Sequence, residues 1–188
     1  MKLYFERFDG QAVTCDDFVQ AMADANPASP LAQHLDAFKR WYSQAGTPTV
    51  HASGMFDAQA QTYTLTLRQS CPATPGQSAS AKQPFVIPVT LGLLDGQGKA
   101  LPLQLQDHNV GTEHTLVLHQ DEQAWTFTGI TSQPTPSLLR SLSAPVLLDY
   151  PFTEAELLTL LAHDRDDFNR WEAAQRLSLR ITTNAIAA

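Results

Sequence analysis

Hydrophobic residues recur with a helical period at the two ends of the chain and with a strand period in its middle. At the amino-terminal end, Thr14 is placed to cap a helix, because Asp16 and Asp17 follow in the first turn, where carboxylates oppose the positive end of the helix dipole. Apolar residues then continue at helical spacing as far as Asn26-Pro27, a pair that ends a helix. The pattern predicts a first helix over residues 14–25.

A second amino-terminal helix is predicted to begin at Ser29, with Pro30 in its first turn, where the missing N–H of proline is no loss. Gly46 and Pro48 mark its end. Its apolar positions fall at helical intervals and form a single stripe on one face. The stripe consists of Leu31, Leu35, Phe38 and Tyr42.

Between residues 47 and 150, apolar and polar residues alternate in short runs bounded by Gly, Pro, Asp or Asn. Seven or eight candidate strands fit into this stretch, a density that predicts an Ig-like antiparallel β-sandwich of two sheets. Residues 71–84, rich in Pro, Ser, Ala and Gln, are predicted to form a long surface loop. The apolar members of the clearest runs are Tyr63, Leu65, Leu67, Leu101, Leu103, Leu105, Trp125 and Phe127.

After Tyr150 the period becomes helical again, and a capping box spans Thr153 to Glu156. Two pairs of opposite charge, four residues apart, are expected on the solvated side: Asp166 with Arg170 and Glu172 with Arg176. The predicted apolar face comprises Leu157, Leu160, Leu161, Phe168 and Trp171.

The three patterns divide the chain into three segments. Helical segments over 1–46 and 151–188 flank a mainly β segment over 47–150. Each flank has a strong apolar stripe, yet neither is long enough to form a helix bundle by itself. The flanks are therefore expected to lie on the sandwich or on something outside this sequence.

Composition narrows the classes of function. The 188 residues include 12 Lys and Arg against 19 Asp and Glu, a formal net charge of −7 at pH 7, so no basic face is expected for nucleic acid. No apolar run approaches the roughly 18 residues of a membrane helix. Charged residues among the first ten positions are unlike a secretory signal peptide. Cys15 and Cys71 are too few for a disulfide scaffold. We expect a soluble cytoplasmic protein with no nucleic-acid or membrane partner.

The six histidines do not form a recognisable zinc site. The hydrolase motif H-E-x-x-H requires Glu directly after His, and no histidine here is followed by Glu. His114 and His119 lie five apart on a predicted strand and should point to opposite faces. His163 and Asp167 are predicted to share a helix face, but as a solvated cluster, because a tight metal site needs three or four ligands.

Other candidates also favour structural roles. Cys15 lies near a helix start without a nearby histidine, so we expect a buried or half-buried structural thiol. The stretch Gly96 to Lys99 lacks the flanking residues of a phosphate loop and is predicted to be a hairpin turn. Trp125 and Phe127 could stack a sugar, but in a sandwich such residues usually belong to the core. No G-x-S-x-G elbow marks a Ser/His/Asp triad. No catalytic, cofactor-binding or metal-ligating residue is assigned.

Five stretches of sequence carry a resemblance to a known family. They are LYFER at 3–7, DGQAVTCDDF at 9–18, FKRWYSQ at 38–44 with GTP at 46–48, SAPV at 143–146, and DFNRWEAAQ at 167–175. In order and spacing they closely resemble the bacterial aminopeptidase N branch of the gluzincin aminopeptidases. Each stretch alone is modest, whereas five in order are specific. Phe8 stands where that branch is expected to have His.

The resemblance implies a parent of four domains that uses zinc to remove amino-terminal residues from peptides. It places 1–46 at the helical end of the catalytic domain, 47–150 as the small β-sandwich, and 151–188 as the first helices of the carboxy-terminal domain. The H-E-x-x-H ligands and the G-x-M-x-N loop of the family are absent here, and Gly54-Met55-Phe56 is not that loop.

The resemblance therefore implies an inactive, non-catalytic connector with no zinc or other cofactor of its own. The zinc would belong to the parent enzyme, which would also bind the peptide substrates. The partners implied for this segment are the catalytic and carboxy-terminal domains of the same chain. Two alternatives stay open at this point. One is an independent Ig-like binding module with an exposed aromatic patch, and the other is an unrelated small hydrolase that uses Cys15.

Overall fold

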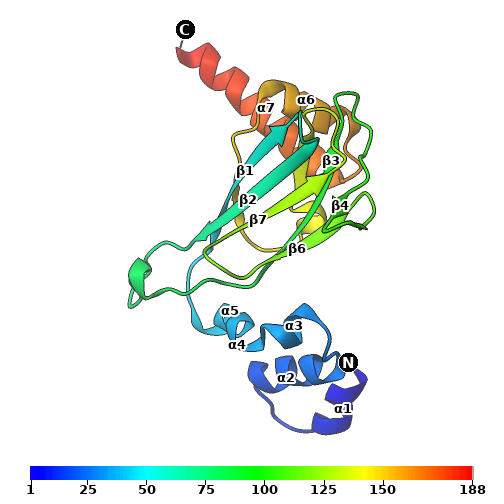
Figure 1. Ribbon diagram of the computed structural model, residues 1–188. Helices are drawn as coiled ribbons and strands as arrows, with labels where there is room; N and C mark the ends of the chain where they lie inside the picture. Colours follow the sequence, from blue (N-terminus) through cyan, green and yellow to red (C-terminus); the bar gives the residue numbers. More distant parts are fainter. Residues whose placement is uncertain (188) are drawn as a thin grey trace.

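The structure is a computed structural model that describes residues 1–187 of the chain. Its amino-terminal helices form a small group at one end of the β-sandwich, while its carboxy-terminal helices lie against the side of the sandwich (Figure 1). The amino-terminal group consists of α1 (Lys2–Phe8), α2 (Cys15–Ala25), α3 (Pro30–Gln33), α4 (Leu35–Phe38) and α5 (Arg40–Ser43).

The helix predicted over 14–25 is confirmed. Thr14 caps α2 and forms a capping box with Asp17, whose carboxylate accepts hydrogen bonds from the backbone N–H and the hydroxyl of Thr14. These bonds favour the charged carboxylate and lower the pKa of Asp17. Val19, Ala21 and Ala23 of α2 are buried.

The single helix predicted from Ser29 to Tyr42 is wrong, although its start is correct: Ser29 caps α3 and Pro30 occupies its first turn. The path is divided into α3, α4 and α5, each a single turn. At the first break, His34 has φ −123° and ψ 28°, outside the helical region. Its ring stacks on that of His119 with the centroids 4.3 Å apart. A contact with the sandwich thus coincides with the interruption that the stripe did not indicate.

The sandwich consists of two sheets, as predicted. The larger has six strands in the order β5-β4-β7-β2-β1-β9, and the smaller has three in the order β6-β3-β8. The strands are β1 (Thr49–Asp57), β2 (Thr62–Ser70), β3 (Ile87–Leu94), β4 (Gln104–Leu105), β5 (His108–Asn109), β6 (His114–Leu118), β7 (Glu122–Thr128), β8 (Thr135–Leu138) and β9 (Leu147–Asp149). Short 3-10 turns occur at η1 (Ala79–Ala81) and η2 (Arg140–Leu142).

The alternation of side chains places the sandwich core as predicted. Tyr63, Leu65 and Leu67 of β2 are fully buried, and Phe127 of β7, which pairs with Tyr63, is also fully buried. Trp125 is half-buried and packs against the same core. Of the run from Leu101 to Leu105, only the last two residues form a strand, because Leu103 exchanges backbone hydrogen bonds with Val110 and Gly111 in a loop.

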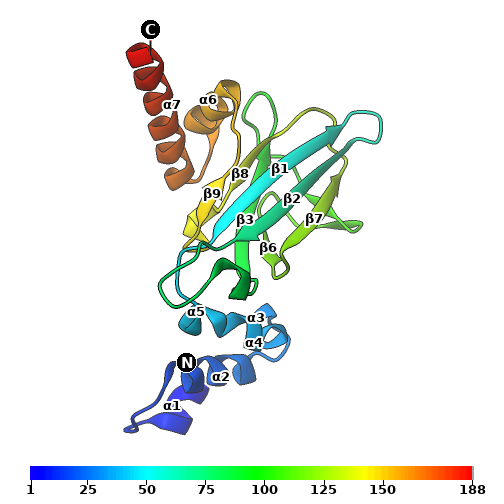
Figure 2. The ribbon, with the colours of Figure 1, turned by 90° about the vertical axis from the view of Figure 1, so that its left-hand side faces the viewer.

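One strand pair departs from the antiparallel arrangement that the sequence predicts. β9 lies beside β1 in parallel register, with Val50 opposite Leu148 and His51 opposite Asp149. A parallel pair needs a long crossover connection, and here all of the intervening sandwich separates the two strands. The first and last strands of the sandwich are thus neighbours, as Figure 2 shows.

The carboxy-terminal end forms α6 (Glu154–His163) and α7 (Asp167–Ala187). The predicted capping box is confirmed, with Thr153 and Glu156 bonded to each other. The predicted apolar face is only partly correct: Leu157 and Leu160 are buried, whereas Phe168 and Trp171 are 37% and 55% exposed. None of the described helices is both long enough and apolar enough to cross a membrane.

Candidate functional site

The residues weighed from the sequence as catalytic or metal-binding do not converge in the structure. His114 begins β6, while His119 follows that strand and stacks on His34. Trp125 and Phe127 face the core. Within residues 1–187, no group of three or more His, Cys, Asp or Glu side chains is arranged to hold a metal ion.

The prediction that His163 and Asp167 share a helix face is wrong, because α6 ends at His163 and α7 begins at Asp167. The break falls at Asp164, whose buried carboxylate bonds to Arg140 of the sandwich and so turns the chain out of the helical path. The expected pair of Asp166 with Arg170 is replaced by a loose contact of Arg170 with Asp167 at 3.9 Å. The pair of Glu172 with Arg176 is present at 2.9 Å.

The two cysteines are free thiols, and one differs from expectation. Cys15 was expected to be buried or half-buried but is exposed in the first turn of α2, because the buried side of that helix begins one turn later, at Val19. Cys71 is half-buried, and its Sγ atom lies 3.7 Å from Lys82 Nζ.

The stretch from Gly96 to Lys99 forms a turn between β3 and the bridge residue Ala100. Asp95 Oδ1 accepts hydrogen bonds from the backbone N–H groups of Gln97 and Lys99, both at 2.9 Å. Donors that could have faced a phosphate are therefore occupied by the turn itself. Gly98 packs against His163, and a Cβ atom at Gly98 would lie only 2.1 Å from the imidazole. The turn thus supports the end of α6.

The side chains that do converge lie where the sandwich meets α6 and α7, a region that we call the carboxy-terminal junction. At its centre is Arg140 of η2, which is 5% exposed. Its guanidinium bonds to Asp164 Oδ1 at 2.7 Å, to Ser137 Oγ at 2.7 Å and to Glu113 Oε2 at 3.2 Å. Because Asp164 is itself buried, this ion pair is largely removed from water.

The backbone beside Arg140 adopts an uncommon conformation. Leu139, Ser141 and Leu142 have φ values of 56°, 55° and 52°, in the left-handed region that residues other than glycine rarely occupy. The N–H of Ser141 donates to Asp166 Oδ2 at 2.7 Å. Gly92 provides space for the guanidinium, because a Cβ atom there would lie 2.7 Å from Arg140 Cζ. Contacts from the sheet and from the turn between α6 and α7 therefore hold this strained segment in place.

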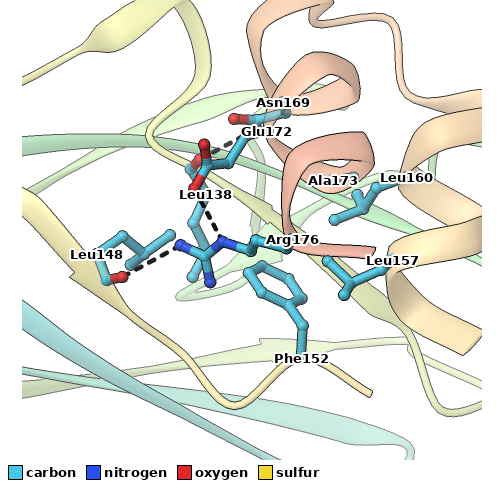
Figure 3. A pocket seen from close by; sticks show the side chains of 9 residues that line it. All are labelled: Leu138, Leu148, Phe152, Leu157, Leu160, Asn169, Glu172, Ala173 and Arg176. Atoms are coloured by element: carbon cyan, nitrogen blue, oxygen red, sulfur yellow. Dashed lines mark hydrogen bonds and ion pairs between the residues drawn. The ribbon is translucent and has the colours of Figure 1, made fainter. Parts of the chain in front are cut away.

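An apolar layer continues the carboxy-terminal junction beside the ion pair. Figure 3 shows Phe152, Leu157, Leu160 and Arg176 among the side chains that line a small pocket. The Arg176 guanidinium lies 5.3 Å from the centre of the Phe152 ring and donates to the carbonyl of Leu148 at 3.2 Å. Phe152, Leu157 and Leu160 belong to the same buried cluster as the core of the sandwich. The helices and the sandwich thus share one core.

Two buried tyrosines join the sheet to the start of α6. The Tyr150 hydroxyl donates to Glu156 Oε1 at 3.3 Å. Burial, together with the negative charge of Glu156, raises the pKa of Tyr150 to about 12. Burial also raises the pKa of Tyr63, whose hydroxyl lies against Gly54. Both phenols therefore stay neutral in the folded protein to a higher pH than an exposed tyrosine does.

The amino-terminal junction, between residues 40–45 and the segment over 71–86, is smaller and more exposed. The Trp41 ring packs on Phe85 with their centroids 4.5 Å apart, and its indole N–H donates to the carbonyl of Val86 at 2.9 Å. Around it the contacts are mainly hydrogen bonds of exposed groups. Lys82 Nζ donates to the carbonyl of Ala45 at 2.7 Å, and the Gln44 amide exchanges hydrogen bonds with the backbone of Gln83.

The central residues of both junctions were missed from the sequence. Arg140 stands among apolar residues in the run LLRSL at 138–142, a signal for a buried charge that needs a partner. The identity of that partner, Asp164, depends on pairing across 24 positions, which no local pattern indicates.

The fold and the two junctions define an Ig-like β-sandwich flanked by helices. The chain belongs to the family described as a domain of unknown function with an Ig-like fold, DUF3458, whose model matches residues 46–151. A second model, DUF3458_C, described as ARM repeats, matches residues 154–188.

The chain is homologous to bacterial aminopeptidase N. It is 47% identical to aminopeptidase N of Escherichia coli over 177 residues and 41% identical to that of Haemophilus influenzae over 178 residues. Each match covers 94% of this chain and 19% of the relative, so the chain spans about a fifth of the length of these relatives. The crystal structure of Legionella pneumophila aminopeptidase A in complex with aspartic acid is 28% identical, with a TM-score of 0.77 over 98% of this chain and 19% of that one.

Proposed function

We propose that this chain is the non-catalytic structural connector of a zinc aminopeptidase. In the whole enzyme it would join the catalytic domain, through residues 1–46, to the helical carboxy-terminal domain, through residues 151–188. The observation that carries the proposal is the carboxy-terminal junction, where a buried ion pair and a shared core fix α6 and α7 to the sandwich. Catalysis depends on the exact placement of the reacting groups, and a rigid connector would keep the domains that supply them in a fixed arrangement.

The zinc and the peptide substrates would belong to the remainder of the enzyme. The H-E-x-x-H ligands that the aminopeptidase family uses do not occur in this sequence. In the whole enzyme, zinc would activate water for attack on the first peptide bond. The chain's own residues would act on this reaction only by placing the domains that perform it.

Exposed apolar side chains support a place inside a larger protein. On α7 these include Trp171, Leu179 and Ile181, which are 55%, 68% and 68% exposed. On the amino-terminal helices they include Phe5 and Tyr42. Repeats of the armadillo type bury such faces against the next helix pair, so α7 would be covered by further helices of the carboxy-terminal domain.

An independent Ig-like binding module is a second candidate. It requires an exposed aromatic or apolar patch on the sandwich itself. Phe127 is fully buried and Trp125 packs against the core, so this aromatic pair does not provide such a patch. The connector is therefore the better supported function. We also propose a cytoplasmic location, which the two free thiols favour.

Grafting tests the connector directly. This chain would replace the matching segment of Escherichia coli aminopeptidase N, to which it is 47% identical. We expect the chimera to bind zinc and to hydrolyse aminoacyl-arylamides, and we expect the isolated chain to do neither. Asp164→Asn in the chimera should reduce activity and thermal stability together, because it releases the carboxy-terminal junction.

The matched control is Leu158→Ala, which removes an exposed side chain of the same helix. Two results would overturn the proposal. One is stoichiometric zinc with hydrolysis by the isolated chain after contaminating peptidases have been removed. The other is a chimera whose activity and stability are equal with and without Asp164→Asn.

A further inference from the structure

Three polar side chains on neighbouring strands form a hydrogen-bonded chain on the outer face of the six-stranded sheet. His51 of β1 lies between Asp149 of β9 and Ser70 of β2. Its Nδ1 atom is 2.7 Å from Asp149 Oδ2, and its Nε2 atom is 2.9 Å from Ser70 Oγ. Figure 2 shows the three strands side by side, with β1 in the middle.

Regular strand geometry holds these side chains on one face. Val50 and Gln69, the neighbours of His51 and Ser70, are buried on the core side, so the alternation of a strand directs His51 and Ser70 outward. The parallel register sets His51 directly opposite Asp149. The site thus rests on rigid elements, and its side chains stay accessible: 31% of the His51 side chain and 67% of the Asp149 side chain are exposed.

With His51 in its neutral form, the order of the hydrogen bonds sets the roles of the three groups. An ionised carboxylate can only accept a hydrogen bond, so a neutral His51 places its proton on Nδ1 and donates it to Asp149. Nε2 is then left with its lone pair and accepts the proton of the Ser70 hydroxyl. This is the arrangement in which an imidazole activates a serine and a carboxylate orients the imidazole.

These three side chains do not need one another as hydrogen-bond partners to offset a cost of burial. An unpaired polar group costs stability when it is removed from water, but each of these three side chains is in contact with solvent. Ser70 itself is exposed on this outer face. A small acyl donor could therefore approach the serine from the solvent side.

We propose that Ser70, His51 and Asp149 form a nucleophilic site that accepts an acyl group from activated esters. Ser70 Oγ would form a bond to the carbonyl carbon of an aryl ester while His51 Nε2 takes the hydroxyl proton. The bond from carbonyl carbon to aryloxide then breaks, and Nε2 returns the proton to the aryloxide, which leaves as a phenol. The product is the Ser70 ester, which water hydrolyses by the same route to release the acid. Asp149 is a positioning residue that acts through His51.

The test uses para-nitrophenyl acetate and the 188-residue chain. Release of nitrophenol is followed by absorbance, and the acetylated residue is located by mass spectrometry of peptides. We expect one acetyl group on Ser70 and its loss in Ser70→Ala. His51→Gln should slow the acylation about 100-fold, within the range that general base catalysis contributes.

Three further variants separate positioning from folding. Asp149→Asn should slow acylation about tenfold or more, because the amide allows the wrong imidazole tautomer, while Asp149→Glu should restore part of the rate. Ser53→Ala alters an exposed serine of the neighbouring strand β1, and this variant should react as the parent chain does. Thermal unfolding of each variant checks that the fold is kept.

Several results would overturn the proposal. Acetylation of Cys71 or Lys82 with Ser70 unmodified would reject it, and so would a Ser70→Ala variant that reacts at the parent rate. Equal rates for His51→Gln and the parent chain, with both folded, would also reject it. None of these outcomes bears on the connector function, which is measured by zinc content and peptidase activity of the chimera.

Discussion

The two junctions of the sandwich differ in what holds them. At the carboxy-terminal junction the helices contribute Leu157, Leu160 and Ala173 to the core of the sandwich and enclose an ion pair. At the amino-terminal junction α2 has a separate small group of buried residues, and Trp41 is the main apolar link. Figure 1 shows the same difference, with the amino-terminal helices grouped at the end of the sandwich.

This difference indicates how rigidly each flank is joined. A shared core loses stability as a unit, so the sandwich and α6–α7 should unfold together. A link made of two aromatic contacts, Trp41 on Phe85 and His34 on His119, together with exposed hydrogen bonds can open while both sides stay folded. The carboxy-terminal junction is therefore a fused joint, in which helices and sandwich unfold together. The amino-terminal junction is a separable joint, in which the helices can detach from a folded sandwich.

Among the substitutions, Asp164→Asn is expected to lower the free energy of unfolding most. The substitution leaves the buried Arg140 with only the half-exposed Glu113 as an acidic partner, and breaking a buried ion pair costs about 3–5 kcal/mol. Urea unfolding should show this loss in one transition. Replacing both charges, as in Arg140→Met with Asp164→Leu, should recover much of the stability. A single substitution without effect would show that the ion pair does not fasten the joint.

A somewhat smaller effect is expected from Leu157→Ala. Truncating a buried leucine costs about 2–5 kcal/mol, and because the core is shared, the strands should be destabilised with the helix. Its neighbour Leu158 is 51% exposed, and Leu158→Ala should change stability by no more than about 0.5 kcal/mol. Hydrogen exchange of β3 and β8 measures the coupling. Faster exchange in α6 alone would contradict a shared core.

Trp41→Ala should act locally. It removes the contact with Phe85 and the hydrogen bond to the Val86 carbonyl, so the amino-terminal helices should separate from an intact sandwich. Limited proteolysis between Gln44 and Pro48 should become faster, while the main unfolding transition shifts little. Tyr42→Ala, at a half-exposed neighbour, is the control. A large shift of the main transition would mean that this joint is also fused.

The two joints should respond to opposite ends of the pH scale. Tyr150 has its pKa raised from 10.0 to about 12, so the neutral phenol stabilises the carboxy-terminal side fully below pH 10, and this contribution is lost as pH rises from 10 to about 12. Denaturant midpoints between pH 9 and 12 should fall, and Tyr150→Phe should flatten the fall. If the denaturant midpoint of Tyr150→Phe fell as steeply as that of the parent chain, Tyr150 would not be the cause of the loss.

The smallest effect is expected in acid. Burial, and then the proximity of His119, lower the pKa of His34, so the folded protein binds its proton less readily than the unfolded chain. Stability is therefore lost as pH falls below the ordinary histidine value of 6.5. The same proteolysis assay should show the amino-terminal joint opening slightly at pH 5, and His119→Gln should reduce that change. Identical acid sensitivity in the variant would rule out the histidine stack.

Local signals in the sequence predicted the local features. The helix cap at Thr14, the capping box at Thr153 and the buried alternation of β2 follow from residues within a few positions of each other. What the sequence did not reveal depends on distant partners. Asp164 ends a helix because of Arg140, and His34 interrupts one where it meets His119.

Dependence on distant partners also explains why the sequence did not reveal the two polar clusters. Ser70, His51 and Asp149 have no motif in common, and they meet only because β1 lies between β2 and β9. The central ion pair of the carboxy-terminal junction likewise required the register of the fold. The class of fold could be predicted from periodicity, whereas long-range polar pairing could not.

The parallel pairing of β1 with β9 sets an order of events during synthesis. His51 leaves the ribosome 98 residues before Asp149, so the edge of β1 remains unpaired while the rest of the sandwich is made. Pairing between strands so far apart in the sequence slows folding. Until it occurs, the exposed edge of β1 can pair with strands of other chains. A chaperone that shields this edge during translation would favour the native assembly over aggregation.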